Sequence, residues 1–243
     1  MDESVYHDMA RLQDTHWWFR ARRRILDSQL QALNLPADCR ILEIGCGPGG
    51  NLPMLQARGE VEAVEMDDYA RQQASQSGVP VSKGWLPDNI PAEAGSYDLV
   101  CLFDVLEHVA DDAAALQCIH TLLRPGGRVL LTVPAWPWLY GPHDRQHHHY
   151  RRYRRPPLRN LLTGAGFTPL KLSYFNSLLF PLVAAARLLE KSGLLSPKQA
   201  LGQRQPPAPL NALLYTLFAC ERHGLRRFDL PLGVSLLALA RRT

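Results

Sequence analysis

The chain has 243 residues, of which 46% are hydrophobic and 21% charged, and its 27 basic and 23 acidic residues give a net charge of +4. This length and composition are typical of one globular domain with additions, and the charge is too small to predict a nucleic-acid-binding protein by itself. The five cysteines are scattered and contain no C-x-x-C pair, so they predict neither a disulfide framework nor a zinc site, and we expect a cytoplasmic protein.

Residues 1–34 are predicted to form one or two charged helices that precede the main fold. Their aromatic side chains gather in HWWF at residues 16–19, and the run RARRR follows directly. One interpretation is an amphipathic helix whose aromatics pack on the sheet while the arginines remain in water. The other is a helical lid that closes over a ligand, with Trp17 and Trp18 as contacts.

Residues 40–50, RILEIGCGPGG, are the segment around which we expect the fold to be organised. Ile41, Leu42 and Ile44 predict a short buried strand, and a glycine-rich turn and a helix from residue 51 follow it. Glycines reach backbone angles that are closed to other residues, and the free N–H groups of a helix N-terminus favour an anion. The segment therefore predicts a cradle for a nucleotide-like ligand.

Further strands are predicted at residues 61–64, 79–81 and 97–103, and each is followed by residues of interest. Glu65 lies about 20 residues beyond the glycine turn, where an acidic residue accepts hydrogen bonds from a ribose. Ligands of doubly wound sheets bind beyond the carboxyl ends of the strands. We therefore expect the glycine turn, Glu65, Trp85 and residues 104–108 at one edge of the sheet.

A helix over residues 111–123 and a turn at PGG precede a fifth strand at residues 128–133, and the loop of residues 135–155 then leaves the same edge. Its sequence, AWPWLYGPHDRQHHHYRRYRR, is expected to form a wall of the substrate pocket. Imidazoles and a carboxylate at His143, Asp144 and residues 147–149 would suit a metal ion, but three adjacent histidines cannot all face one ion from regular structure. Arginines interleaved with tyrosines over residues 150–155 would suit RNA, and a solvated helix face is the simplest alternative.

Our preferred interpretation of this loop is a pocket for an anionic or phosphate-bearing small substrate. Arg152 or its neighbours would hold the anion. His143 or His149 would remove a proton from the substrate, because an unperturbed imidazole titrates near neutral pH. Substrate contacts are predicted at Asp144, Tyr150, Arg152 and Tyr153.

Two apolar helices are predicted in residues 173–230, an insertion between a sixth strand at residues 167–172 and a last strand at residues 233–240. The uncharged run between Lys171 and Arg187 contains Pro181 and falls short of the ~20 residues that span a bilayer. The insertion is interpreted either as a hydrophobic cap or homodimer interface, or as a surface for peripheral membrane contact or for shielding a lipid-like substrate.

Three ordered blocks resemble the class I S-adenosylmethionine-dependent methyltransferases, in particular the small-molecule branch related to the ubiquinone-pathway methyltransferases. The blocks are Glu43 with the glycine turn, YDLVCLFDVLEHV at residues 97–109 and LLRPGGRVLLTVP at residues 122–134. The resemblance covers about residues 35–167. It implies an α/β fold with a doubly wound, mostly parallel seven-stranded sheet, whose Rossmann-like core comprises residues 35–172 and 231–243.

The resemblance implies S-adenosylmethionine as the cofactor, held at the carboxyl edge of the sheet. The predicted cofactor contacts are Glu43, Gly45, Cys46, Gly47, Gly49, Glu65, Met66, Trp85, Asp104 and Val105. Many relatives have an acidic residue for the adenine amino group at the position of Trp85, where an indole would stack on the purine or simply pack. His108 is a further candidate base, although the E-H pair after this strand often has a structural part in the family. No metal is predicted.

These features together predict methyl transfer to an oxygen, nitrogen or carbon of a small molecule. One alternative is an RNA-modifying methyltransferase that uses the basic patch at residues 150–155. This alternative is disfavoured because the sequence lacks the D-P-P-Y type motif of nucleic-acid amino methyltransferases. The residues that follow Asp104 are V-L-E instead of P-P-Y. The other is a nicotinamide-dependent oxidoreductase, since the glycine pattern alone would also suit a dinucleotide. This alternative is disfavoured because the sequence shows no separate substrate domain.

Overall fold

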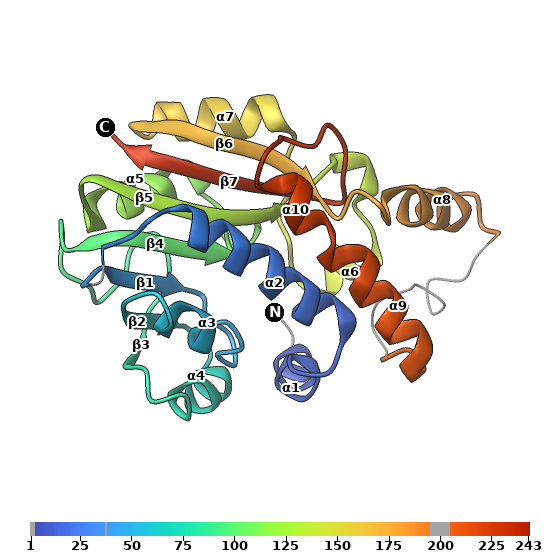
Figure 1. Ribbon diagram of the computed structural model, residues 1–243, viewed down its shortest axis with the longest axis horizontal. Coiled ribbons are helices and arrows are strands. Elements are labelled where there is room, and N and C mark those ends of the chain that lie inside the picture. The colour runs from blue at the N-terminus through green and yellow to red at the C-terminus, as the bar shows by residue number, and fades with distance from the viewer. Residues whose placement is uncertain (1–2, 37, 195–204) are drawn as a thin grey trace.

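The computed structural model describes residues 3–36, 38–194 and 205–243, and its strands form one seven-stranded sheet in the order β3-β2-β1-β4-β5-β7-β6 (Figure 1). The strands are β1 (Arg40–Ile44), β2 (Glu60–Glu65), β3 (Val81–Lys83), β4 (Tyr97–Phe103), β5 (Leu123–Pro134), β6 (Phe167–Phe175) and β7 (Ser235–Arg242). The pairs among β1 to β5 are parallel, and β7 runs antiparallel to both of its neighbours, β5 and β6. The predicted doubly wound sheet with an antiparallel strand near the C-terminus is confirmed.

Helices cover both faces of the sheet. They are α1 (Glu3–Leu12), α2 (Trp17–Ala32), α3 (Leu52–Gln56), α4 (Asp68–Ser75), α5 (Asp112–Leu122), α6 (Pro142–Gln146), α7 (Arg155–Gly164), α8 (Phe180–Lys191), α9 (Ala208–Ala219) and α10 (Glu221–Leu225), with short 3₁₀ turns η1 (Leu106–His108) and η2 (Pro137–Leu139). One apolar layer contains α5 and α7, and the other contains α2, α3, α9 and α10. Because both faces are covered, the central strands are apolar on both sides, as in β4, where Val100 and Leu102 enter one layer and Leu99 and Cys101 the other.

Four strands differ from the sequence prediction by more than one residue at an end. β6 continues to Phe175 instead of residue 172, and β7 occupies Ser235–Arg242 instead of residues 233–240. β5 begins at Leu123 instead of residue 128, because Leu123 pairs with Tyr97 ahead of a register shift in the ladder with β4. β3 occupies Val81–Lys83 instead of residues 79–81, since these residues pair with Ala63, Val64 and Glu65 of β2. Neither pairing is visible in the hydrophobic pattern of a single segment.

The insertion before the last strand folds as α8, α9 and α10, and residues 195–204 within it lie outside the described residues. α2 packs along α9 in front of the sheet (Figure 1). Asn211 of α9 joins them, because its side chain accepts from the Trp17 N–H at 2.9 Å and donates to the Thr15 carbonyl at 3.0 Å. Across the described residues, no helix is both long and apolar enough to cross a bilayer.

Candidate active site

The glycine turn lies at the carboxyl end of β1 and is packed too closely for side chains. Gly47 and Gly49 have φ angles of +55° and +89°, in the left-handed region that favours glycine. A Cβ atom at Gly49 would lie 2.8 Å from the Cα atom of Ala74 in α4, and one at Gly45 would lie 2.6 Å from a methyl carbon of Val105. The turn therefore presents backbone, without side chains, to the space above it.

Glu65, the last residue of β2, points into this turn. Its Oε2 atom accepts from the Gly47 N–H at 2.7 Å, and its Oε1 atom accepts from the Asp67 N–H at 2.9 Å. Burial raises the pKa of Glu65, and hydrogen bonds from the backbone N–H groups of Asp67, Gly47 and Met66 act in the opposite direction. A carboxylate has room for about four donors, so this fixed group can still accept from a ribose hydroxyl.

Helix α1 covers the turn, and only a small, partly open cavity lies between them. Met9 lies over Gly47 and Gln13 over Gly50, while the buried Tyr6 lies close enough to Glu65 and Asp67 for burial and their charges to raise its pKa. The cavity is lined by Met9, Gln13, Phe19, Arg22, Arg23, Cys46, Pro48, Gly50 and Asn51. The N-terminal segment thus lies directly over the glycine turn.

A buried charge cluster lies beside this cavity, and Arg22 at its centre was not singled out from the sequence. Its Nη2 atom is 3.1 Å from Asp104 Oδ2, and its guanidinium lies 4.9 Å from the Trp18 ring and 5.7 Å from the Phe103 ring. The run RARRR gives no reason to select one arginine. The spacing of Trp18 and Arg22, four residues apart on one helix face, is the signal that identifies it.

Glu43 is fully buried next to this cluster. Asn51 donates to its Oε1 atom at 2.9 Å, and its Oε2 atom has no hydrogen-bond partner among the described residues. Burial raises the pKa of Glu43 from 4.5 to about 7, against the effect of the Asn51 hydrogen bond and the Arg22 charge.

Glu43 is expected to make the stability of the protein depend on pH. Its raised pKa means that the folded chain binds this proton more tightly, so the contribution is complete below the unfolded pKa and is lost as the pH rises through about 7. The loss is on the order of 3 kcal/mol. Urea unfolding of Glu43→Gln at acidic and alkaline pH should lack this decrease, whereas Glu60→Gln, at an exposed position, should retain it. Equal pH dependence in the two variants would contradict this assignment.

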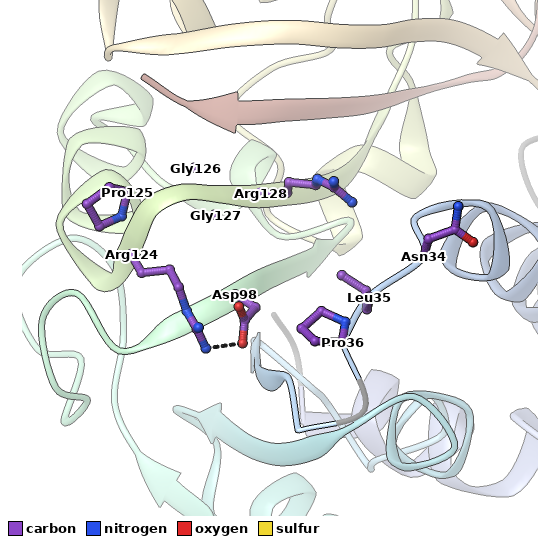
Figure 2. A pocket seen from close by; sticks show the side chains of 9 residues that line it. All are labelled: Asn34, Leu35, Pro36, Asp98, Arg124, Pro125, Gly126, Gly127 and Arg128. Atoms are coloured by element: carbon purple, nitrogen blue, oxygen red, sulfur yellow. Dashed lines mark hydrogen bonds and ion pairs between the residues drawn. The ribbon is translucent and has the colours of Figure 1, made fainter.

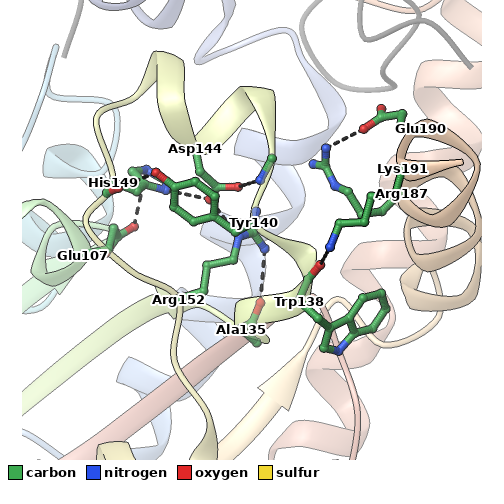
Figure 3. Close-up of polar contacts among 11 residues, drawn as sticks. Glu107, Ala135, Trp138, Tyr140, Asp144, His149, Arg152, Arg187, Glu190 and Lys191 are labelled. Atoms are coloured by element: carbon green, nitrogen blue, oxygen red, sulfur yellow. Dashed lines mark hydrogen bonds and ion pairs between the residues drawn. The ribbon is translucent and has the colours of Figure 1, made fainter. Parts of the chain in front are cut away.

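The loop between β5 and α7 is built around the fully buried Asp144 (Figure 3). Asp144 accepts from His149 Nδ1 at 2.9 Å, from Arg152 Nε at 2.7 Å and from the Gly141 N–H at 2.8 Å. Burial alone would raise the pKa of Asp144, but these three donors and the Arg152 charge hold it well below its usual range. Asp144 is therefore a carboxylate that fixes the orientation of His149.

The other ring nitrogen of His149 faces a second carboxyl group, that of Glu107, whose pKa is raised whereas that of Asp144 is lowered. Its Nε2 atom is 4.0 Å from Oε1 of Glu107, which is fully buried and has no hydrogen bond on either side-chain oxygen among the described residues. Burial and the charge of Asp104 raise the pKa of Glu107 well above its ordinary value. Asp144 thus favours a proton on Nδ1 of His149, and Nε2 keeps its lone pair.

Three other histidines surround His149. The His108 ring lies 4.6 Å from that of His149, and His143 and His147 lie 4.1 Å from each other. Burial and the neighbouring His149 lower the pKa of His108 to about 3. The surrounding protein likewise lowers the pKa of His143 to about 4, against the effect of the Asp144 charge, although part of the His143 side chain is exposed. Ligand atoms of Glu107, His108 and His149 all lie within 4.8 Å of one another, a set that a divalent cation would fit. The sequence suggested a different set, because only the fold brings η1 against this loop.

Several residues predicted to contact the substrate also make contacts within the protein. The Trp17 ring packs against Phe218 and so joins α2 to α9. The buried Tyr153 donates its hydroxyl to Asp112 Oδ2 at 2.9 Å. The side chain of Arg152, expected to hold an anion, donates to Asp144 and to the Ala135 carbonyl. The contacts of Tyr153 and Arg152 stabilise the loop between β5 and α7.

Three predicted contacts, Met66, Trp85 and Tyr150, have largely exposed side chains. Met66 and Trp85 follow β2 and β3 at the carboxyl edge, and the Trp85 backbone pairs with Asn89. The exposed Trp85 indole therefore lies near Glu65, at the edge of the sheet where it was expected. Cys46, another predicted contact, is buried in the layer that contains α2.

A larger, open cavity lies at the opposite edge of the sheet (Figure 2). It is lined by Asn34, Leu35, Pro36, Asp98, Arg124, Pro125, Gly126, Gly127 and Arg128. Asp98 there accepts from the Arg40 N–H at 2.8 Å and pairs with Arg124. These contacts join the amino ends of the strands, away from the edge where such sheets bind ligands.

The sheet order, the glycine turn and the acidic end of β2 define a Rossmann-like nucleotide-binding protein of the methyltransferase type. Residues 16–172 match the methyltransferase domain family, to which the chain belongs, and the resemblance predicted from three sequence blocks is confirmed, with S-adenosylmethionine as cofactor.

Curated proteins match part of this chain. The ubiquinone biosynthesis O-methyltransferase of Xanthomonas axonopodis pv. citri (strain 306) is 38% identical over 106 residues, which are 40% of this chain and 44% of that protein. The chain thus spans less than half the length of this curated relative.

Solved structures under 25% identical share the fold. One comes from the complex of the Haloferax volcanii Trm112 methyltransferase activator with a methyltransferase, with a TM-score of 0.63, 16% identity and coverage of 98% of this chain and 94% of that chain. Another is the Haemonchus contortus phosphoethanolamine N-methyltransferase 2 in complex with S-adenosyl-L-methionine, with a TM-score of 0.57, 16% identity and coverage of 88% and 52%.

Proposed function

We propose that this protein transfers the methyl group of S-adenosylmethionine to a hydroxyl or amino group of a small molecule. The fixed Glu65 carboxylate over the glycine turn carries the cofactor half of the proposal. When bound, the cofactor supplies a methyl carbon that its sulfonium has already activated. Glu65 would hold the ribose hydroxyls, and Arg22, beside the cavity under α1, would hold the carboxylate of the methionine end.

The acceptor half of the proposal rests on the Asp144–His149 pair. Asp144 holds His149 by Nδ1, so its Nε2 atom can take a proton from an acceptor hydroxyl or amine. Glu107, beside that nitrogen, follows Asp104 at the carboxyl end of β4, so His149 lies at the sheet edge where the cofactor is proposed to bind, which supports its assignment as the base. Because Arg152 is already engaged with Asp144 and Ala135, we no longer expect it to select an anionic acceptor.

Calorimetric titration with S-adenosylhomocysteine and with NADH tests the class of ligand. Micromolar binding of S-adenosylhomocysteine and none of NADH is expected, and the reverse result would overturn the proposal. A screen of candidate acceptors for a mass increase of one methyl group then identifies the acceptor. The similarity to ubiquinone biosynthesis O-methyltransferases makes aromatic hydroxyl compounds the first to screen.

An RNA substrate is disfavoured by the partners of the basic patch. Arg151 pairs with Asp112 at 2.7 Å, Arg152 with Asp144, and Arg155 donates to the Leu230 carbonyl. These guanidinium groups are committed to contacts within the protein and do not form a free surface for phosphates. Purification should therefore yield no RNA whose retention falls steeply with salt.

Trp85→Ala is expected to weaken S-adenosylhomocysteine binding by about tenfold, because an aromatic ring stacked on a base contributes ~1–3 kcal/mol. The indole is 45% exposed next to the end of β3, so its removal should leave the fold intact. Turnover at saturating cofactor should stay unchanged. Equal affinities in calorimetry would assign Trp85 to surface packing alone.

A further inference from the structure

Helix α8 has an apolar face that nothing within the described chain covers. None of its residues is buried, although the sequence FPLVAAARLLEK is mostly apolar. Leu182, Ala185 and Leu189 are exposed and follow one another at helical spacing, and Leu188 lies beside them. A helix that buries no residue gains little from packing against its own protein, so this face is suited to a contact outside the chain.

Helix α9 has a second face of this kind. Leu214 and Phe218 are buried against the body of the protein, whereas Leu210, Leu213 and Leu217 are exposed at helical spacing on the other side. α8 and α9 lie at the same end of the molecule along its longest axis (Figure 1). Their exposed leucines therefore form an apolar region at this end of the molecule. A protein that makes no contact here would not need such a region.

The described part of the insertion is also basic. Residues 173–194 and 205–230 contain five Lys and Arg and three acidic residues, a net charge of +2. Two of the acids are withdrawn from the surface: Glu190 pairs with Arg187, and the buried Glu221 accepts from the N–H groups of Ser177 and Leu178. The third, Asp229, pairs with Lys171 at 2.8 Å.

We propose that α8 and α9 form a docking surface for an anionic lipid bilayer, on which the protein lies without spanning it. Exposed leucines enter the boundary between headgroups and acyl chains, and basic side chains meet anionic headgroups. A second copy of the chain fits this surface less well. A two-fold interface would place the same positive patch against itself, whereas anionic lipid neutralises it.

The docking surface adjoins the loop that carries Asp144 and His149 (Figure 3). Lys191 of α8 donates to the Trp138 carbonyl at 2.6 Å, and the Arg187 guanidinium lies directly against Gly141, whose N–H holds Asp144. A bilayer under α8 would therefore lie next to the acceptor side of the site. This consequence rests on the proposed function, but the docking itself does not.

Flotation with lipid vesicles tests the proposal. The full chain is mixed with vesicles of phosphatidylglycerol and phosphatidylcholine in equal amounts, or of phosphatidylcholine alone. We expect binding to the anionic vesicles to be about tenfold stronger, and to weaken with salt. The double variant Leu182→Glu, Leu189→Glu should bind anionic vesicles at least about tenfold less, since two leucines no longer leave water.

Leu170→Glu is the matched control, because Leu170 on β6 is 50% exposed and Leu182 is 51% exposed. It adds one negative charge outside α8 and α9, so binding to anionic vesicles should persist. Lys191→Gln, at the end of α8, provides a second variant, expected to reduce the preference for anionic lipid, and thermal unfolding verifies that each variant folds. Absence of vesicle binding by the unmodified chain would overturn the proposal. So would equal binding by the double leucine variant, or a dimer in sedimentation that this variant separates.

Discussion

Gly47→Val is expected to lower the affinity for S-adenosylhomocysteine by at least about 100-fold, because two costs combine at this position. The φ angle of +55° lies in a region that a β-branched residue adopts only with strain. A Cβ atom there would also lie 3.3 Å from the Met9 side chain, in the space between α1 and the turn. Any shift of the backbone would move the Gly47 N–H that holds Glu65. Calorimetry measures the loss.

Gly95→Val separates the loss of the site from backbone strain alone. Gly95 has a φ angle of +67°, and a Cβ atom there would meet nothing within 4 Å. It lies in the loop that leads to the amino end of β4, away from the cofactor edge. Both variants should lose stability in thermal unfolding, but only Gly47→Val should lose ligand affinity. Similar affinities in the two variants would show that the turn does not bind the cofactor.

The positions of the proposed cofactor residues could be predicted because they depend on local sequence. The short strand, the glycine turn and Glu65 lie within one strand–helix–strand unit, and the spacing that indicates a ribose contact is fixed by that unit. The apolar runs at β1 and β4 likewise predict central strands, since both faces of such a sheet are buried. For these elements, local pattern and final structure agree.

The acceptor half depends on contacts between distant segments, which no local pattern contains. Asp144 and His149 were predicted as separate candidates, but the pairing of His149 with Glu107 exists only because η1 lies against the loop, where the Tyr150 N–H donates to the Glu107 carbonyl at 2.8 Å. The packing of Trp17 on α9 has the same origin. The sequence alone does not show that an arginine or tyrosine in a basic run has a partner within the protein. In the structure, Arg152 donates to Asp144 and Tyr153 donates to Asp112.

His149→Ala is expected to lower kcat by about 10²–10⁴-fold, the usual contribution of a general base, with little change in S-adenosylhomocysteine affinity. The side chain lies on the loop between β5 and α7, and no contact of His149 with the glycine turn or Glu65 would be lost. His143→Ala is the matched control, since His143 lies on the same loop but is exposed. A large loss of kcat in His143→Ala with none in His149→Ala would assign the base to His143.

Asp144→Asn extends this test from the base to the group that orients it. The amide keeps the shape of the carboxylate but loses the charge that favours a proton on Nδ1 of His149 and that pairs with Arg152. We expect a loss in kcat of about 10²-fold or more, because the imidazole then presents the wrong tautomer in part of the molecules. A structural role alone would lower the unfolding midpoint and leave kcat per folded molecule unchanged. If Asp144 and His149 act as one unit, adding Asp144→Asn to His149→Ala should cause almost no further loss of kcat. The reason is that a carboxylate that orients an imidazole has no function once the imidazole is absent.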